Sequence, residues 1–410
     1  MGPYLYDSHC HLSPYCLAVD GLGSTIDNDS SVCQMALMST NHFDMELVLQ
    51  LARSSASSQV IIPCIGVHPW YSHLFAANGT VSHEDHYLGV IKSSESISPS
   101  FLQKLPAPVS FPSHMTRMEQ QITKLLQDGS RKVVIVGEIG IDKLFRIPWS
   151  GFLGNTEARY NKTGDNDKDN ENNNSDTKIL TTVPPLSPYR VSMDHQLYIF
   201  KEQLALAWRT QLPISVHCVK AHGLIYDTIM EFITSNKKHA PTTTIPAICL
   251  HSYTGSVDSA KRWVSKKTRE KLGKKTKVFF SFSKVLNCPD SDISEQGTGS
   301  DISKQIIASD TSKPGTDSDA SKPGTNSGSL KNCYSKSETE FIKLVQMLPE
   351  DTILIETDLS IDKYYNGTNQ SQHSCDLQAV LRQICNIKGW SLDQGTTVLN
   401  DNWNKFKGEA

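Results

Sequence analysis

The sequence predicts an α/β protein built as a (β/α)8 TIM-type barrel with long loop insertions. Eight short apolar segments are spread along the chain. Most are continuous hydrophobic runs rather than alternating ones, which is typical of parallel strands buried on both faces. Segments with helical spacing lie between several of them and indicate βαβ units. The chain has 410 residues, 38% of them hydrophobic, which is enough for a large core.

The expected strands, in chain order, are Tyr4–His9, Val32–Met38, Gln59–Val67, Lys132–Glu138, Leu212–His217, Ile245–His251, Lys277–Phe282 and Thr352–Thr357. The expected helices between them are Asp44–Ser54, Met115–Leu126, Asp194–Gln211, Gly223–Ser235 and Ser337–Leu348. Within 194–211, apolar residues recur at the spacing of one helix face, namely Leu197, Phe200, Leu204 and Ala207.

We expect one domain, residues 1–410, interrupted by two disordered insertions at 155–182 and 290–335. The first is rich in Asn, Asp, Lys and Thr, and the second is rich in Ser, Gly and Pro and repeats SKPGT at 312–316 and 321–325. Such compositions bury too little apolar surface to offset the entropy of ordering. Segment 72–113 contains three histidines and several prolines, and we expect a long surface loop with one short helix.

Charge, cysteine content and hydropathy limit the function classes. The net charge is −3, so the overall charge gives no indication of a basic surface that binds nucleic acid. The ten cysteines include no C-x-x-C pair, which favours reduced thiols over disulfides or a zinc knuckle. The chain has no run of about 18 apolar residues and begins without a leader pattern. We therefore expect no membrane contact and a location in the cytoplasm, the nucleus or both.

A local basic segment lies at 256–277. Its nine lysines and arginines are Lys261, Arg262, Lys266, Lys267, Arg269, Lys271, Lys274, Lys275 and Lys277. A solvated helix and loop is the simpler interpretation, and a surface that steers DNA is the alternative. Because the segment follows an expected strand directly, we expect it near the barrel face that carries the active site.

Six polar residues stand at or just after the ends of the expected strands: His9, His11, Glu138, His217, His251 and Asp358. In a (β/α)8 barrel the carboxyl ends of all strands meet at one face, where active sites lie. The two histidines of the first strand are two residues apart, so both side chains lie on the same side of it. Imidazole and carboxylate ligands together suit Zn, Mn or Mg.

Taken singly, a histidine at a strand end is more often a packing or surface residue than a ligand. Glu138 and Asp358 are less ordinary, because a charge at the end of a buried strand is costly unless it is paired or bound to metal. Four neutral histidines and two carboxylates carry two negative charges against four positive charges from two divalent ions. The remaining positive charge favours an anionic ester as substrate.

Two ions about 3.5–4 Å apart can stabilise both the attacking and the leaving oxygens of a phosphodiester displacement. Glu138 is the residue that we expect to bridge them. Asp358 is expected to ligate one ion and to accept the proton of the attacking water. We therefore expect Glu138 and Asp358 to be catalytic and one or two divalent cations to be present per chain.

Several motifs then resemble a known family: D-S-H-C-H-L at 7–12, G-V-H-P at 66–69, G-E-I-G-I-D at 137–142, V-H-C at 216–218, H-S-Y-T-G at 251–255 and E-T-D at 356–358. In this order they resemble the TatD-type metal-dependent deoxyribonucleases, a branch of the amidohydrolase-like barrels. The resemblance implies hydrolysis of DNA phosphodiesters, often as a 3′-to-5′ exonuclease, with the six residues named above as ligands.

The resemblance also suggests roles near the ligands. His68 matches a motif histidine beside the site, and we expect it to bind substrate. Lys220 stands where the family usually has arginine, and it is expected to bind substrate without the bidentate fork that suits phosphate. Asp142 is expected to shape the turn or to support the ligands. Ser360 stands where proline is common, which loosens the loop beside the expected base.

Two alternatives remain open. An amidohydrolase or lactonase acting on a small carbonyl substrate would use comparable ligands, since activated water attacks either centre, and fold alone does not separate them. A barrel kept as a protein-interaction scaffold, with the insertions as docking segments, is the other. DNA is the expected partner under the leading hypothesis, and a protein partner that docks through the insertions is a further expectation.

Overall fold

The computed structural model describes residues 5–29, 31–54, 60–77, 81–127, 133–154, 185–240, 242–287, 336–366 and 370–409. The two predicted insertions, 155–182 and 290–335, lie outside the described residues, so their expected disorder stays a prediction.

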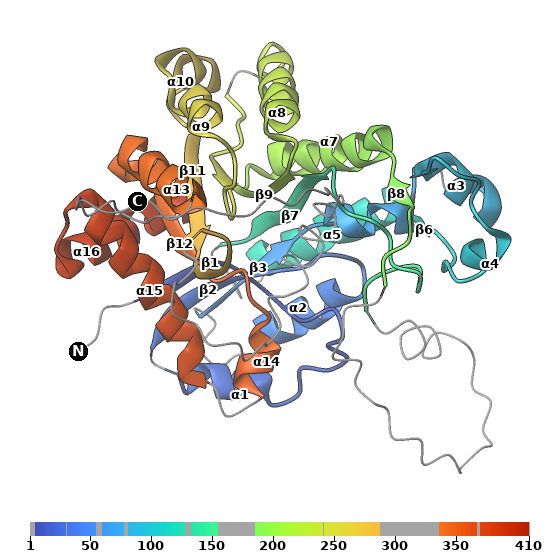
Figure 1. Ribbon diagram of the computed structural model, residues 1–410, viewed down its shortest axis with the longest axis horizontal. Coiled ribbons are helices and arrows are strands. Elements are labelled where there is room, and N and C mark those ends of the chain that lie inside the picture. The colour runs from blue at the N-terminus through green and yellow to red at the C-terminus, as the bar shows by residue number, and fades with distance from the viewer. Residues whose placement is uncertain are drawn as a thin grey trace, which may run out of the picture.

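Eight parallel strands form the central sheet, in the order β1-β2-β3-β7-β9-β10-β11-β12 (Figure 1). Their bounds are β1 Leu5–His11, β2 Val32–Met38, β3 Ile61–Ile65, β7 Ile135–Asp142, β9 Ile214–Val219, β10 Ala247–Leu250, β11 Lys277–Ser283 and β12 Ile353–Glu356. A parallel bridge joins His11 to Ser360, and the His11 amide donates to Leu359 O at 2.9 Å. The first and last strands therefore approach each other at their carboxyl ends, and the sheet forms a nearly closed barrel.

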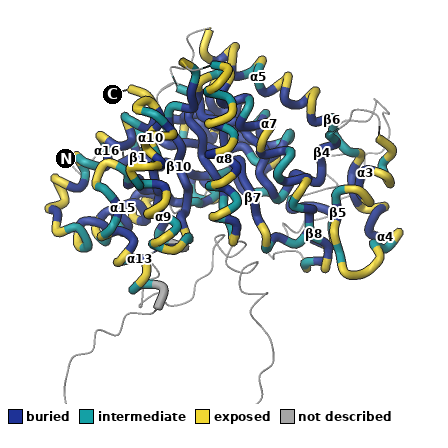
Figure 2. Tube along the Cα trace, turned by 90° about the horizontal axis from the view of Figure 1, so that it is seen from above, coloured by how far each residue is buried: buried dark blue, intermediate teal, exposed yellow. Residues whose placement is uncertain are grey.

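Helices cover the outside of the barrel, and the strands inside are buried (Figure 2). The helices are α1 Leu22–Asp27, α2 Asp44–Ser54, α5 Phe111–Gln127, α7 Met193–Thr210, α8 His222–Lys237, α9 Val257–Val264, α10 Lys266–Leu272, α11 Lys284–Asn287, α13 Lys336–Met347, α14 Ile361–Tyr365, α15 Gln370–Lys388, α16 Leu392–Lys407 and the 3₁₀ turn η2 Glu350–Thr352. Serine side chains cap several N-termini. Ser192, for example, accepts from the His195 amide at the start of α7.

The predicted fold class is confirmed, and all eight predicted strands lie in the central sheet. Strand β7 continues four residues past the predicted end at Glu138, and every residue in it is buried. Glu138 ends the hydrophobic run in the sequence, yet it and Asp142 are both buried inside the barrel. All five predicted helices are present, with ends that differ from the predictions by a few residues.

Helices α15 and α16 were not predicted from the sequence. Both have polar compositions, yet each buries one face against the barrel. Trp403 of α16 stacks on Tyr6 of β1, with ring centroids 4.9 Å apart and an interplanar angle of 3°. The last helices of the chain therefore cover its first strand.

The prediction for segment 72–113 was wrong. Instead of a loop with one short helix, it contains the end of η1 Pro69–Leu74, then β4 Phe75–Ala76, α3 His83–Val90, β5 Ile91–Lys92, α4 Pro99–Leu102 and β6 Val109–Ser110. β4 pairs with β6, and β5 pairs with β8 Arg190–Val191. Buried histidines hold this arm together: His73 donates to Gly151 O, His86 to His73 O and His195 to Ser72 O, at 2.8–2.9 Å.

The basic segment 256–277 forms solvated helices and a turn, as in the simpler interpretation, and extends from the carboxyl rim at Ser256 to the amino end of β11. Its basic side chains are exposed on α9, α10 and the turn that follows. Lys277 is the first residue of β11, at the amino end of a seven-residue strand, roughly 20 Å from the carboxyl end where the site residues lie. Arg262 pairs with Asp227 at 2.9 Å, and Lys261 with Asp258 at 3.2 Å. Most of this segment therefore forms an outer surface rather than a wall of the site.

The cysteines agree with the expectation of reduced thiols. Eight cysteines fall among the described residues, and all eight are free. Nowhere in the described part of the chain is a helix both long and apolar enough to cross a membrane.

Candidate metal centre

The six residues proposed as ligands meet at the carboxyl ends of the barrel strands. His9 and His11 end β1, Glu138 is the fourth residue of β7, and His217 is the fourth of β9. His251 follows β10 directly, and Asp358 lies two residues after β12. The parallel register brings these positions to one rim, although the chain between the first and the last is about 350 residues long.

The carboxylate of Glu138 lies at the centre of the cluster. Its Oε2 lies 3.2 Å from His9 Nε2 and 3.1 Å from His11 Nε2. Its Oε1 lies 2.7 Å from His217 Nδ1 and 2.6 Å from His251 Nε2. One oxygen thus faces the histidine pair of the first strand, and the other faces the two later histidines. Glu138 is 1% exposed, so the carboxylate has exchanged water for these imidazoles.

Asp358 closes the cluster on the side of β12. Its Oδ1 lies 3.4 Å from His11 Nε2 and 3.9 Å from His9 Nε2. Its backbone has φ of 56°, which a residue other than glycine rarely adopts. The Asp358 amide donates to His9 O at 2.9 Å. The backbone of Asp358 is therefore held against the first strand, beside the histidine pair.

Three sets of side chains bring one ligand atom each within 4.8 Å of one another: His9, His251 and Asp358; His9, His11 and Glu138; and His68, Glu138 and His217. Two of the nitrogen pairs also approach each other closely, with His9 Nε2 3.0 Å from His11 Nε2 and His217 Nδ1 3.2 Å from His251 Nε2. Nitrogen and carboxylate oxygen atoms that converge in this way are the donor set that Zn²⁺ or Mn²⁺ prefers. The residues present therefore fit a divalent cation.

Three of the four proposed histidine ligands contact a second polar group through the ring nitrogen that points away from the cluster. His9 Nδ1 lies 2.9 Å from Ser215 Oγ. His217 Nε2 lies 3.3 Å from Asp142 Oδ2, and His251 Nδ1 lies 3.6 Å from Glu356 Oε1. Such outer partners fix the tautomer and the orientation of a ligating ring. The rings of His9 and His217 are therefore oriented by the protein itself, whereas His251 Nδ1 makes no hydrogen bond at this distance.

His68 directs Nε2 toward Glu138, as His9, His11 and His251 do. Its Nδ1 accepts a hydrogen bond from the Trp70 amide at 3.1 Å, so the neutral ring carries its proton on Nε2. That nitrogen lies 3.3 Å from Glu138 Oε1. Burial lowers the pKa of His68 to about 4, which keeps the ring neutral at pH 7. In this tautomer the His68 ring directs an N–H toward Glu138.

Charges in the cluster shift the pKa values of its members strongly. Burial alone raises the pKa of Glu138, but His251, His68 and His9 lower it more and hold it well below its usual value. Burial lowers the pKa of His251, yet the charge of Glu138 raises it well above the usual value. For His11 burial again lowers the pKa, and hydrogen bonds to Asp358 and Glu138 raise it to about 10. The two carboxylates thus attract positive charge to this point.

Sequence reasoning missed Glu356 and Ser215. Glu356 is fully buried, accepts from the Ser252 amide at 2.7 Å and also accepts from the Ser281 hydroxyl. Its position in the buried run before Asp358 was the only signal, because a carboxylate inside a strand needs partners.

The geometry of Asp142 agrees with the expectation that it shapes the turn or supports the ligands. Its Oδ1 accepts from two amides of the following turn, and its Oδ2 contacts Trp70 Nε1 at 2.7 Å and His217.

Lys220 follows β9 at the same rim, with φ of 53° and an exposed side chain. It stands three residues after His217 and outside the histidine cluster.

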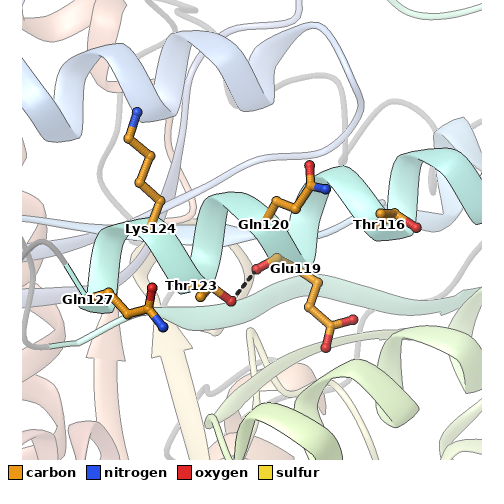
Figure 3. Close-up of a pocket in the computed structure, with 6 residues that line it drawn as sticks. All are labelled: Thr116, Glu119, Gln120, Thr123, Lys124 and Gln127. Atoms are coloured by element: carbon orange, nitrogen blue, oxygen red, sulfur yellow. Dashed lines mark hydrogen bonds between the residues drawn. The ribbon is translucent and has the colours of Figure 1, made fainter.

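A groove elsewhere on the molecule, of about 690 Å³, runs along α5 (Figure 3). The residues that line it all come from one helix: Thr116, Glu119, Gln120, Thr123, Lys124 and Gln127. None of the proposed site residues lines this groove, so it plays no part in the chemistry considered below.

A parallel barrel with histidines and carboxylates caged at the carboxyl ends of its strands defines an amidohydrolase-like hydrolase. The model of the TatD related DNase family matches residues 6–298, and the chain belongs to this family. The match ends before β12, so Asp358 lies beyond the matched segment.

Two relatives of known sequence and one solved structure resemble the chain. It is 32% identical over 291 residues to an uncharacterised deoxyribonuclease of Saccharomyces cerevisiae, covering 70% of this chain and 77% of the relative. It is 26% identical over 315 residues to the Cut9-interacting protein scn1 of Schizosaccharomyces pombe, covering 69% and 79%. A TatD family hydrolase of Entamoeba histolytica shares the fold, with a TM-score of 0.52, 11% identity and complete coverage of both chains.

Proposed function

We propose that the protein hydrolyses phosphodiester bonds of DNA, as a 3′-to-5′ exonuclease, at the cluster around Glu138. The observation that carries this proposal is the division of the Glu138 carboxylate between two nitrogen pairs, with Oε2 toward His9 and His11 and Oε1 toward His217 and His251. A carboxylate shared in this way suits a bridge between two cation positions. Membership of a family of deoxyribonucleases supports DNA as the substrate.

Each residue has a stated role in this proposal. The ligands are His9, His11, Glu138, His217, His251 and Asp358. One or two divalent cations, Mg, Mn or Zn, would supply positive charge to a phosphodiester and lower the pKa of a water molecule. Asp358 accepts the proton of the attacking water, since its carboxylate lies at the open edge of the cluster, with 17% of its side chain exposed. Glu138 keeps the two pairs of histidine nitrogens in a fixed position relative to each other.

Substrate contacts are assigned to two residues. His68 presents a neutral N–H toward Glu138 Oε1, from where it can donate to a phosphate oxygen that approaches the same point. Lys220, exposed after β9, contributes a point charge for a phosphate farther along the strand. The basic segment on α9 and α10 has no assigned role, because it begins to extend away from the rim at Ser256.

The proposal is tested with the purified protein and single-stranded DNA labelled at the 5′ or the 3′ end, in Mg²⁺ or Mn²⁺. We expect successive release of nucleotides from the 3′ end, which EDTA stops. Glu138→Ala and Asp358→Asn should each abolish release. Glu340→Gln, at an exposed carboxylate on α13, is the matched control for a contaminating nuclease and should retain full activity. Equal activity in the wild type and both site variants would show the proposal to be wrong.

Two other functions have weaker support. Turnover of esters or amides without DNA cleavage would favour a carbonyl hydrolase. A protein partner that docks through 155–182 or 290–335 is supported only by the name of the Schizosaccharomyces pombe relative, which describes an interaction with Cut9. That the chain forms one domain, and that it works in the cytoplasm or nucleus, both stay predictions.

A further inference from the structure

A fully buried carboxylate, Asp7, ties the first strand to the last at the rim of the proposed centre. Its Oδ1 accepts from the His9 amide and from the Thr357 amide, both at 3.0 Å. Its Oδ2 accepts from the Thr357 hydroxyl at 2.5 Å and from His373 Nε2 at 2.8 Å. Asp7 and His373 are each 0% exposed, so these four contacts replace all the water that a free carboxylate would bind.

The contacts fall beside residues that are proposed as ligands. Asp7 binds the amide of His9 in β1. It also binds Thr357, which follows β12 and directly precedes Asp358. The Asp358 amide then donates to His9 O at 2.9 Å. Asp358 also adopts a left-handed backbone with φ of 56°, which a residue other than glycine rarely adopts. Such a conformation persists only when its neighbours fix it, and Thr357 is fixed by Asp7 through both its amide and its hydroxyl.

His373 supports Asp7 from outside the barrel. It belongs to α15, in the part of the chain that the family match does not reach. Its Nδ1 lies 3.0 Å from the Tyr365 hydroxyl, which donates to Asp29 Oδ2 at 3.0 Å. The imidazole is thus held on both nitrogens. A buried polar pair of this kind contributes less to stability than well-packed apolar residues would, so packing alone does not account for it.

We propose that Asp7 and His373 form a positioning pair that fixes His9 and Asp358 in the geometry that binds divalent cations. Asp7 contacts the His9 amide rather than the ligating side chains, and the pair acts through the backbone of the two ligands. The inference rests on the proposed metal centre but not on the reaction that occurs there. Removing the partner of a buried carboxylate should free the segment 357–358 from the first strand and weaken cation binding.

The test compares three variants of the full chain. His373→Leu removes the donor to Asp7, whereas His373→Gln places an amide N–H near the position of Nε2 and keeps it. His114→Leu is the matched control, because His114 is also a helical histidine, 4% exposed, and lies on α5. The Mn²⁺ dissociation constant is measured by calorimetry, and hydrogen exchange of the Thr357 and Asp358 amides is measured in EDTA.

We expect His373→Leu to weaken Mn²⁺ binding by about 10- to 100-fold, as loss of a partner outside the ligands usually does, and to speed exchange at both amides. His373→Gln should restore both quantities to near wild type. His114→Leu should change stability without changing either. If His373→Leu changes stability alone, as the control does, the positioning role is wrong.

Thr357→Val is the milder second variant, for use if His373→Leu fails to fold. It removes only the hydroxyl contact with Asp7 and should weaken Mn²⁺ binding in the same direction. Unchanged Mn²⁺ affinity in Thr357→Val would overturn the inference. Both readouts are made without DNA, so a wild-type protein that binds Mn²⁺ but leaves DNA intact refutes the proposed reaction and leaves the positioning pair standing. A wild-type protein that binds no Mn²⁺ refutes both.

Discussion

His251 Nε2 lies 2.6 Å from Glu138 Oε1, although strand β9 separates their two strands in the sheet. The contact exists because both side chains lean into the barrel at its carboxyl rim. It joins the later histidines to the same carboxylate that faces the first-strand pair. Most of the expected behaviour of the site follows from this shared carboxylate.

Cation removal should lower the stability of the wild type and leave that of Glu138→Gln unchanged. A ligand that binds only the native state stabilises it by about 2.7 kcal/mol when its concentration is 100 times the dissociation constant. We expect a loss of this size when Mn²⁺ is replaced by EDTA, measured by urea unfolding at pH 7.5. Glu138→Gln keeps the shape of the side chain but not its charge. A similar EDTA effect in this variant would contradict the central role of Glu138.

His68→Gln should reduce activity without reducing cation affinity. The His68 ring accepts from the Trp70 amide through Nδ1 and presents N–H toward Glu138, so its loss removes a donor rather than a ligand. We expect KM for DNA to rise about tenfold, with the Mn²⁺ dissociation constant within twofold of wild type. Calorimetry and steady-state assays check the two values. A large loss of Mn²⁺ affinity would instead make His68 a ligand.

Lys220→Ala should raise KM for DNA severalfold and weaken the dependence of KM on salt, because one phosphate contact contributes about one unit to the salt slope. Lys271→Ala is the matched control. Lys271 is exposed on α10, in the basic segment that extends away from the rim, and its removal should leave KM unchanged. If Lys271→Ala has the larger effect, DNA approaches along α10 and the assignment of Lys220 is wrong.

Acid should destabilise the fold through three buried histidines. Burial lowers the pKa of His73, His114 and His195 to about 4 each. Between about pH 6.5 and pH 4 the unfolded chain binds protons that the native state does not, so stability is fully present above pH 6.5 and is lost as the pH falls. At pH 5 each group costs about 2 kcal/mol relative to pH 7.5.

The measurement is urea unfolding at pH 7.5 and pH 5.0, in EDTA so that cation binding does not contribute. His114→Leu should reduce the difference between the two pH values by about 2 kcal/mol, since this histidine has no hydrogen bond on Nε2 among the described contacts. An unchanged difference would mean that His114 is already protonated in the native state at pH 5.

The sequence predicted the strands well because their buried residues form continuous apolar runs, as in Ile61–Ile65. It also predicted which polar residues meet, because each proposed ligand follows such a run and parallel strands share one rim. The arm at 72–113 was not predicted, since its short strands have two residues each and its order depends on hydrogen bonds from His73, His86 and His195. Hydrogen bonds of this kind leave no periodic pattern in the sequence.

The outer partners of the histidines were harder to predict for a related reason. Glu356 lies in the apolar run before Asp358, and Ser215 lies in the run before His217. The residue type alone does not indicate which partner either side chain contacts. His373 is a lone histidine in a polar helix, 366 residues from the Asp7 that it supports. Only the fold joins the two ends of the chain.

The contact between Asp7 and Thr357, which joins the first strand to the last, has a consequence for biosynthesis. The histidine pair emerges from the ribosome well before Thr357, which lies 350 residues after Asp7, so the contact between these two residues forms only after β12 has been made. A nascent chain therefore carries His9 and His11 without Asp358 beside them until β12 has been made. The proposed cation site can therefore assemble only after the ribosome has passed Asp358.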